Sequence, residues 1–98
     1  MCGATAGGLS LDGVNTKIEA IVQGQVTKAG TPVSTGYVRL LDRSGEFTAE
    51  VPVSATGHFR FFAGDGEWTL RTLVPGADPI DRKVQAAVGS IAEVEITV

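Results

Sequence analysis

From Lys17 to the end of the chain, apolar and polar residues alternate in short runs separated by clusters of Gly, Pro, Ser and Asp. Such alternation puts successive side chains on opposite faces of a strand, and turn clusters about every 8 to 12 residues are typical of sandwiches and barrels. Apolar residues never recur with helical spacing over three turns, so we expect no substantial helix. The pattern predicts seven strands, at residues 18 to 28, 36 to 42, 46 to 53, 58 to 63, 67 to 74, 80 to 87 and 91 to 98.

The phase of each run also predicts which side chains face the core. Residues 1 to 16 show neither the strand period nor the helix period, so we expect a flexible arm there and a sandwich domain at residues 17 to 98. The predicted inward set is Ala20, Val22, Gly24, Val26, Val38, Leu40, Phe47, Ala49, Val51, Val53, Phe59, Phe61, Trp68, Leu70, Val74, Val84, Val94, Ile96 and Val98.

Length, charge, hydropathy and cysteine content limit the classes of protein to which the chain can belong. A chain of 98 residues is the usual size of one domain. The net charge is −3 and the basic residues are scattered, so nucleic acid is not expected as a partner. No apolar stretch approaches the ~18 residues of a membrane-spanning helix. The single cysteine cannot form an internal disulfide, which favours a reducing, cytoplasmic location.

Five short motifs carry a first resemblance: Val22-x-Gly24-x-Val26, Gly30-x-Pro32-Val33, Val38-x-Leu40, Gly57-x-Phe59-x-Phe61 and Gly66-x-Trp68-x-Leu70. Together they resemble the carboxypeptidase-regulatory-like domains, which have the transthyretin-like (prealbumin-like) Greek-key β-sandwich fold. The resemblance covers residues 20 to 98. It implies a fold and no single function, because modules of this kind serve many functions.

A closer resemblance rests on Met1-Cys2-Gly3-Ala4 and on residues 36 to 77. These segments are similar to an uncharacterised actinobacterial family of small proteins of about this length, often encoded beside a thiosulfate sulfurtransferase. The family has no assigned activity. The resemblance implies a role in sulfur metabolism, with a sulfurtransferase as the partner.

Cys2 is the first candidate functional residue. Removal of Met1 would leave its thiol beside a free α-amino group, and a protonated amine stabilises a neighbouring thiolate. On a flexible arm such a thiolate can accept sulfur as a persulfide. The alternative is an inert cysteine on a disordered tail. A lipid anchor is not expected, because nothing apolar precedes Cys2.

Three arginines form the second candidate group. Strict alternation puts Arg39, Arg60 and Arg71 on the outer faces of their strands, where neighbouring guanidinium groups can hold a small anion such as thiosulfate or sulfite. The alternative is cross-strand pairing with carboxylates on a solvated face, with Glu46, Glu50 or Glu67 as partners.

Four apolar residues also fall in the outward phase: Tyr37, Leu41, Phe62 and Leu73. Together they can form an apolar patch for docking a protein. The alternative is that a loop or a second sheet edge covers them.

No complete enzyme site is evident. His58, the only histidine, falls in the outward phase and is expected to be an exposed strand residue. A histidine-based triad needs a partnered nucleophile and an orienting acid, and a zinc site needs three or four closely spaced ligands. One His and one Cys supply neither, so we expect no catalytic residues, no metal and no cofactor.

The sequence therefore predicts a non-catalytic accessory or binding module, linked by resemblance to sulfurtransferase metabolism and accepting sulfur on Cys2. Two alternatives stay open. One is a structural or carbohydrate-binding-like sandwich, although Trp68 falls in the core phase. The other is a hydrolase like the transthyretin-related hydroxyisourate hydrolases, whose sites use several histidines and a C-terminal Tyr-Arg-Gly-Ser motif, while this chain ends Glu95-Ile96-Thr97-Val98.

Overall fold

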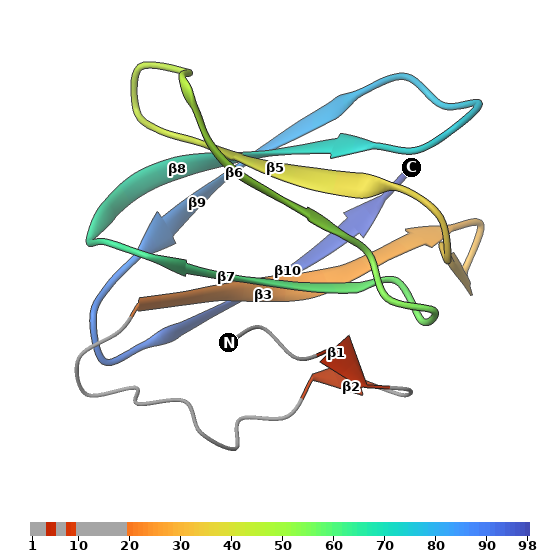
Figure 1. Ribbon diagram of the computed structural model, residues 1–98, viewed down its shortest axis with the longest axis horizontal. Helices are drawn as coiled ribbons and strands as arrows, with labels where there is room; N and C mark the ends of the chain where they lie inside the picture. Colours follow the sequence, from red (N-terminus) through yellow and green to blue (C-terminus); the bar gives the residue numbers. More distant parts are fainter. Residues whose placement is uncertain (1–3, 6–7, 10–19) are drawn as a thin grey trace.

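The computed structural model of the chain describes residues 4–5, 8–9 and 20–98. Residues 20–98 form two packed β-sheets, which Figure 1 shows as an upper layer containing β5, β6 and β8 and a lower layer containing β3, β7 and β10. Within the described residues no helix is long and apolar enough to cross a membrane. The strands of the sandwich are β3 (Ala20–Lys28), β4 (Thr31–Pro32), β5 (Tyr37–Leu41), β6 (Phe47–Pro52), β7 (His58–Ala63), β8 (Gly66–Leu73), β9 (Ile80–Ala86) and β10 (Ile91–Thr97).

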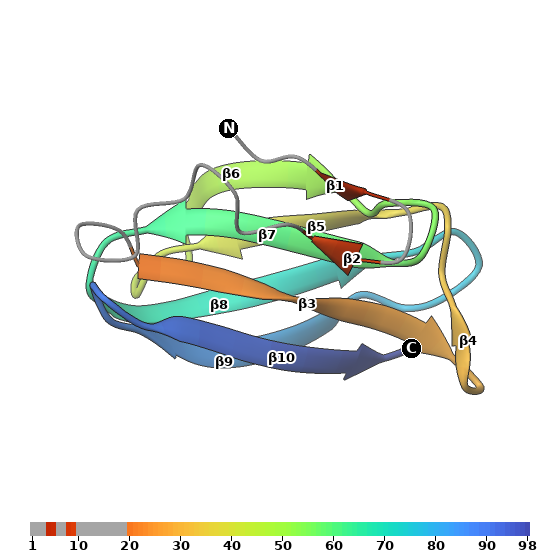
Figure 2. The ribbon, with the colours of Figure 1, turned by 90° about the horizontal axis from the view of Figure 1, so that it is seen from below.

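The first sheet is built around β3 and is called here the β3 sheet. The antiparallel strand β7 pairs with one side of β3, and the parallel strand β10 pairs with the other, as Figure 2 shows. The short strand β4 extends this sheet beyond the end of β7, because it pairs with Thr27 and Lys28 of β3. The β3 sheet therefore joins the first long strand of the sandwich directly to the last.

The second sheet, called the β5 sheet, has the order β6-β5-β8-β9 and is antiparallel throughout. Its register sets Arg39 of β5 opposite Arg71 of β8, and Tyr37 opposite Leu73. Outer-face residues of β5 and β8 therefore stand side by side in rows across the sheet.

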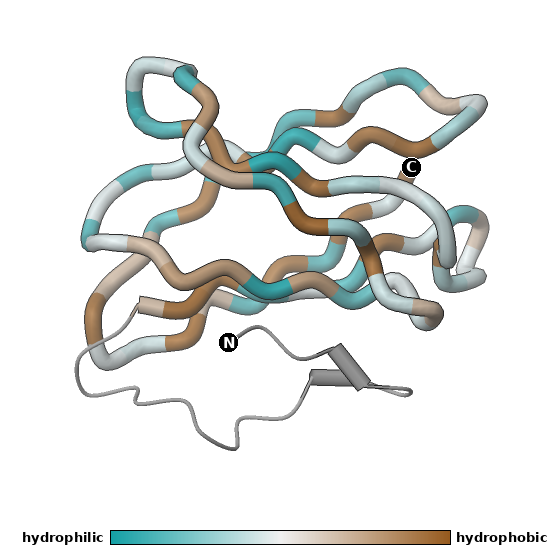
Figure 3. Tube along the Cα trace, in the orientation of Figure 1, coloured by the Kyte–Doolittle hydropathy of each residue, from teal (hydrophilic) through white to brown (hydrophobic). Residues whose placement is uncertain are grey.

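The core lies between the two sheets. Most of its residues are every second residue of a strand, because successive side chains of a strand point to opposite faces. Figure 3 shows apolar and polar positions alternating along the strands. Every predicted inward residue except Phe47 and Gly24 belongs to the buried core cluster or packs against it, and Gly24 is itself buried. The all-β class is confirmed, because residues 20–98 form eight strands in two sheets, and β4 is a strand that the sequence did not predict. The Greek-key order and the transthyretin-like assignment stay predictions.

The inward placement of Phe47 is wrong, since 61% of its surface is exposed. The register between β5 and β6 shifts between Leu40 and Leu41, so that Leu40 faces Ala49 while Leu41 faces Phe47. A β-bulge of this kind inserts one residue and turns the following side chains to the other face. The ring of Phe47 consequently meets the guanidinium carbon of Arg39, at 5.9 Å from the ring centroid.

Gly24 allows the backbones of β3 and β10 to approach closely. A Cβ at this position would lie 1.8 Å from the carbonyl oxygen of Val94 and 3.1 Å from the ring of Phe59. Glycine within a strand marks such close approaches, because any side chain would separate the strands. The pairing of β3 with β10 therefore depends on this residue.

We predict that Gly24→Ala lowers the free energy of unfolding by about 3 kcal/mol, because the added methyl group overlaps the β10 backbone. Urea denaturation measures the change. Gly64→Ala is the matched control, since a Cβ at exposed Gly64 meets no heavy atom within 4 Å. Equal stability of Gly24→Ala and the control would show that β10 does not need this close approach.

Thr72 is a polar residue at the centre of the apolar core. Its side chain has 0% exposure, and its Oγ1 has no hydrogen-bond partner among the residues that the structure describes. A buried hydroxyl without a partner costs about 1 to 3 kcal/mol of desolvation. The inward phase of β8 explains the position, because Thr72 follows Leu70 by two residues.

We predict that Thr72→Val, which keeps the shape and removes the hydroxyl, raises the free energy of unfolding by about 1 kcal/mol and the melting temperature by roughly 4–8 °C. Differential scanning calorimetry gives the shift. Thr69→Val, on the opposite face of β8, is the control and should change stability by less than about 0.5 kcal/mol. A loss of stability in Thr72→Val would mean that the hydroxyl is hydrogen-bonded in solution.

Candidate functional site

Cys2 lies outside the described residues, as does most of the predicted arm at residues 1 to 16. Within that range the structure describes β1 (Ala4–Thr5) and β2 (Gly8–Leu9), which pair with each other antiparallel. Both short strands lie beside β7 of the β3 sheet, as Figure 2 shows. Residues 4–5 and 8–9 therefore lie against the sandwich, while the flexibility of the arm stays a prediction.

Arg39 and Arg71 share the outer face of the β5 sheet as predicted. Each forms an ion pair with a carboxylate. Arg39 Nε donates to Glu50 Oε1 at 2.6 Å, which is one of the pairings weighed from the sequence. Arg71 donates to both carboxylate oxygens of Asp81, from Nε at 2.9 Å and from Nη2 at 3.0 Å. The hydrogen bond from Arg71 holds the pKa of Asp81 below its ordinary value. Anion binding here stays a prediction, and an anion would have to compete with these two carboxylates.

The expectation that Arg60 shares a surface with Arg39 and Arg71 is wrong. Arg60 lies on β7 of the β3 sheet, and only 3% of its surface is exposed. Its Nε donates to Oε1 of Gln23 at 2.9 Å, and Gln23 Nε2 donates to Glu93 Oε1 at 2.6 Å. The prediction that Arg60 points outward was right, but the prediction that it is exposed was wrong. The short strands β1 and β2 lie beside β7. The result is a polar row across β7, β3 and β10.

The four predicted interface residues do not form one patch. Phe62 is on β7 of the β3 sheet, whereas the other three are on the β5 sheet. Leu41 stands opposite Phe47, beyond the bulge in β6, and is buried, with 5% of its surface exposed. Tyr37 is 50% exposed and stands opposite Leu73 in the register. The structure therefore brings together only Tyr37 and Leu73.

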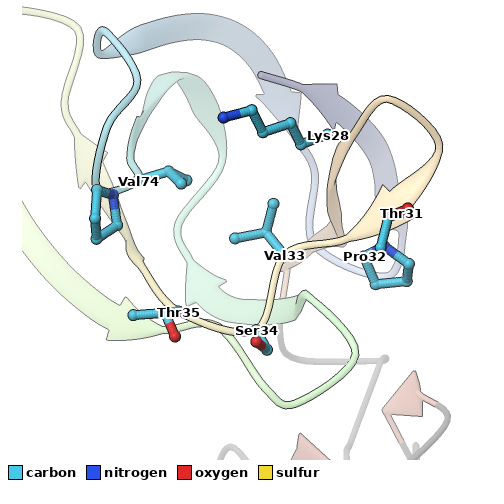
Figure 4. A pocket seen from close by; sticks show the side chains of 8 residues that line it. Lys28, Thr31, Pro32, Val33, Ser34, Thr35 and Val74 are labelled. Carbon is cyan, nitrogen blue, oxygen red and sulfur yellow. The ribbon is translucent and has the colours of Figure 1, made fainter.

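Tyr37 and Leu73 border a hollow at one end of the sandwich, which we call the turn-end hollow. It has two adjoining lobes that share Thr35, Val74 and Pro75. The first lobe has a volume of about 390 Å³ and is drawn in Figure 4. The second has a volume of about 320 Å³. The remaining lining residues are Lys28, Thr31, Pro32, Val33 and Ser34 in the first lobe, and Gly36, Tyr37, Leu73 and Ala77 in the second.

Sequence reasoning missed this hollow. Its lining comes from the turn after β3, the segment between β4 and β5, and the residues after β8. No local pattern shows that these segments meet at one end of the sandwich. The Gly30-x-Pro32-Val33 motif marks the turn, but the opposite wall depends on the pairing of β5 with β8.

His58 is half-buried instead of fully exposed, because its ring is held by a neighbouring turn. Its Nδ1 lies 2.8 Å from Thr56 Oγ1, which lies 3.2 Å from Ser54 Oγ. In the described part of the chain, no three His, Cys, Asp or Glu residues are grouped so as to hold a metal ion.

Trp68 is half-buried and packs against the core, in agreement with its predicted phase. Its indole Nε1 donates to the carbonyl oxygen of Gly64 at 3.0 Å. A flat sugar-binding platform needs an exposed ring face, so this tryptophan does not favour the carbohydrate-binding alternative.

Two solved structures that are similar in fold to this chain carry the matching domain within a longer chain. The chain matches the Bacillus anthracis TIE protein with a TM-score of 0.72 and 10% identity, over 82% of this chain and 17% of that one. It matches BcpA, the major pilin subunit of Bacillus cereus, with a TM-score of 0.69 and 17% identity, over 81% and 28% of the two chains. At these identities the likeness concerns the fold alone.

Two relatives by sequence match the chain along its whole length. The uncharacterised proteins Rv0814c and Rv3118 of Mycobacterium tuberculosis are each 44% identical over 100 residues, which is 100% of this chain and 99% of theirs. A Mycolicibacterium smegmatis uncharacterised protein is 53% identical over 62% of this chain and 69% of its own length. A family model described as "Protein of unknown function (DUF1416)" matches residues 2–98. The chain therefore belongs to the DUF1416 family.

Proposed function

We propose that this chain is a non-catalytic accessory module of sulfur metabolism, which docks a sulfurtransferase through the second lobe of the turn-end hollow and accepts sulfur on Cys2. The observation that carries the docking part is the pairing of Tyr37 with Leu73 across β5 and β8, beside an apolar lobe of about 320 Å³. Exposed aromatic side chains next to apolar hollows are typical of the anchoring points of protein interfaces.

Two observations support a role for Cys2. It is the only cysteine of the chain, so any sulfur bound as a persulfide has a single site. The family match begins at residue 2, so the segment that carries this thiol lies within the domain that the family shares. The proposal assumes a cytoplasmic location, where reducing conditions keep a cysteine free of stable disulfides.

The transfer step resembles thiol–disulfide exchange. The sulfurtransferase first takes the outer sulfur of thiosulfate onto its own cysteine and releases sulfite. The Cys2 thiolate then attacks the terminal sulfur of that persulfide, and the partner's cysteine leaves as a thiolate. One sulfur–sulfur bond forms as one breaks, so the step needs no external oxidant or reductant.

The carrier role predicts that incubation with a thiosulfate sulfurtransferase and thiosulfate adds the mass of one sulfur atom to the chain. Intact-mass spectrometry without reductant detects the product. The Cys2→Ser variant should gain nothing, because no other cysteine is present. A persulfidated partner beside an unmodified wild-type chain would end the carrier proposal.

The docking role predicts that Tyr37→Asp slows this transfer about tenfold, as expected when a charge replaces an interface anchor. Phe47→Asp is the matched control, because Phe47 is an exposed aromatic of the same sheet that does not line the hollow. Reaction of Cys2 with a small thiol reagent should be the same in both variants. Equal transfer rates in the two variants would exclude docking at this lobe.

A further inference from the structure

The first lobe of the turn-end hollow combines an apolar floor with a cation at its mouth. Val33 and Val74 pack against the core and are half-buried, while Pro32 and Pro75 stand beside them. The volume of about 390 Å³ lies within the range of small-molecule sites. Figure 4 shows Lys28 extended over the hollow, with its ammonium nitrogen directed toward the Val74 side.

The walls of this lobe are fixed by backbone geometry. Lys28 pairs with Thr31 across a two-residue turn, in which Ala29 and Gly30 both have positive φ angles, of 51° and 82°. Such turns fit the twist of a hairpin. Val33, two residues after Thr31, donates from its amide to the carbonyl oxygen of Val26 at 2.9 Å. A ligand would therefore meet a site that is already formed, which reduces the entropy lost on binding.

The lobe is lined by a single charged side chain, which is positive. Its lining contains Lys28 and no carboxylate, and within the described residues Lys28 forms no salt bridge. Arg39 and Arg71, by contrast, are both neutralised by acidic neighbours. The hydroxyl groups of Thr31, Ser34 and Thr35 belong to the same lining and can donate hydrogen bonds to an anion.

We propose that this lobe binds a small amphipathic carboxylate, whose apolar body covers Val33 and Val74 and whose carboxylate pairs with Lys28. The apolar floor alone would accept a neutral ligand, and the lysine alone would accept any anion. Their combination selects a ligand that carries both groups. This site goes beyond the sulfur-carrier role and does not depend on it.

The test is a titration of the ¹⁵N-labelled full chain with hexanoate, followed by NMR, with hexanamide as the neutral control. Hexanoate should give saturable shifts at the amides of Val33, Ser34, Thr35 and Val74, with a dissociation constant of about 1 mM, as suits so small a ligand. Hexanamide should bind at least about fivefold more weakly, since it lacks the charge that pairs with Lys28.

Two lysine variants make the test specific. Lys28→Gln should weaken hexanoate binding about fivefold without unfolding the chain, because Lys28 is exposed. Lys83→Gln, at an exposed position on β9 outside the hollow, should leave binding unchanged. Equal binding of hexanoate and hexanamide, equal affinities of the two variants, or shifts scattered away from the first lobe would each overturn the proposal. No saturable binding would do so as well.

Discussion

The sandwich depends on β3, which holds its sheet together from both sides. Val22 and Val26 of this strand are fully buried against the β5 sheet, while β7 and β10 pair along its two edges. The parallel pairing with β10 closes the domain by joining its first long strand to its last. That pairing leaves no room for a Cβ at Gly24. The close approach of β3 and β10 therefore requires glycine at this position.

The two outer faces of the sandwich differ in how their charges are satisfied. On the β5 sheet, Arg39 and Arg71 form ion pairs at the surface, where such pairs contribute little to stability. On the β3 sheet, Arg60 is buried and hydrogen-bonded to Gln23, in a row that continues to Glu93. A buried guanidinium requires such partners, because an unsatisfied charge away from water is costly. This row therefore acts as structural support, whereas the turn-end hollow offers both a half-buried apolar floor and the ammonium group of Lys28.

The two proposed roles belong to different segments of the chain. The thiol of Cys2 comes before the sandwich, and the family match includes it. The hollow belongs to the turns at one end of the sandwich, and the exposed ring of Tyr37 borders its second lobe.

The sequence by itself determined the all-β class and most of the residues that face the core, because a period of two is a local property of an extended chain. It also identified the outward phase of Arg39, Arg60, Arg71 and Tyr37. Tertiary structure decided which of these residues meet. Only the strand order sets Arg39 beside Arg71 and puts Arg60 on the other sheet, and only the bulge in β6 turns Phe47 to the solvent. The hollow was hidden for the same reason, since Lys28, Val33 and Val74 come together only when distant turns pack at one end of the sandwich.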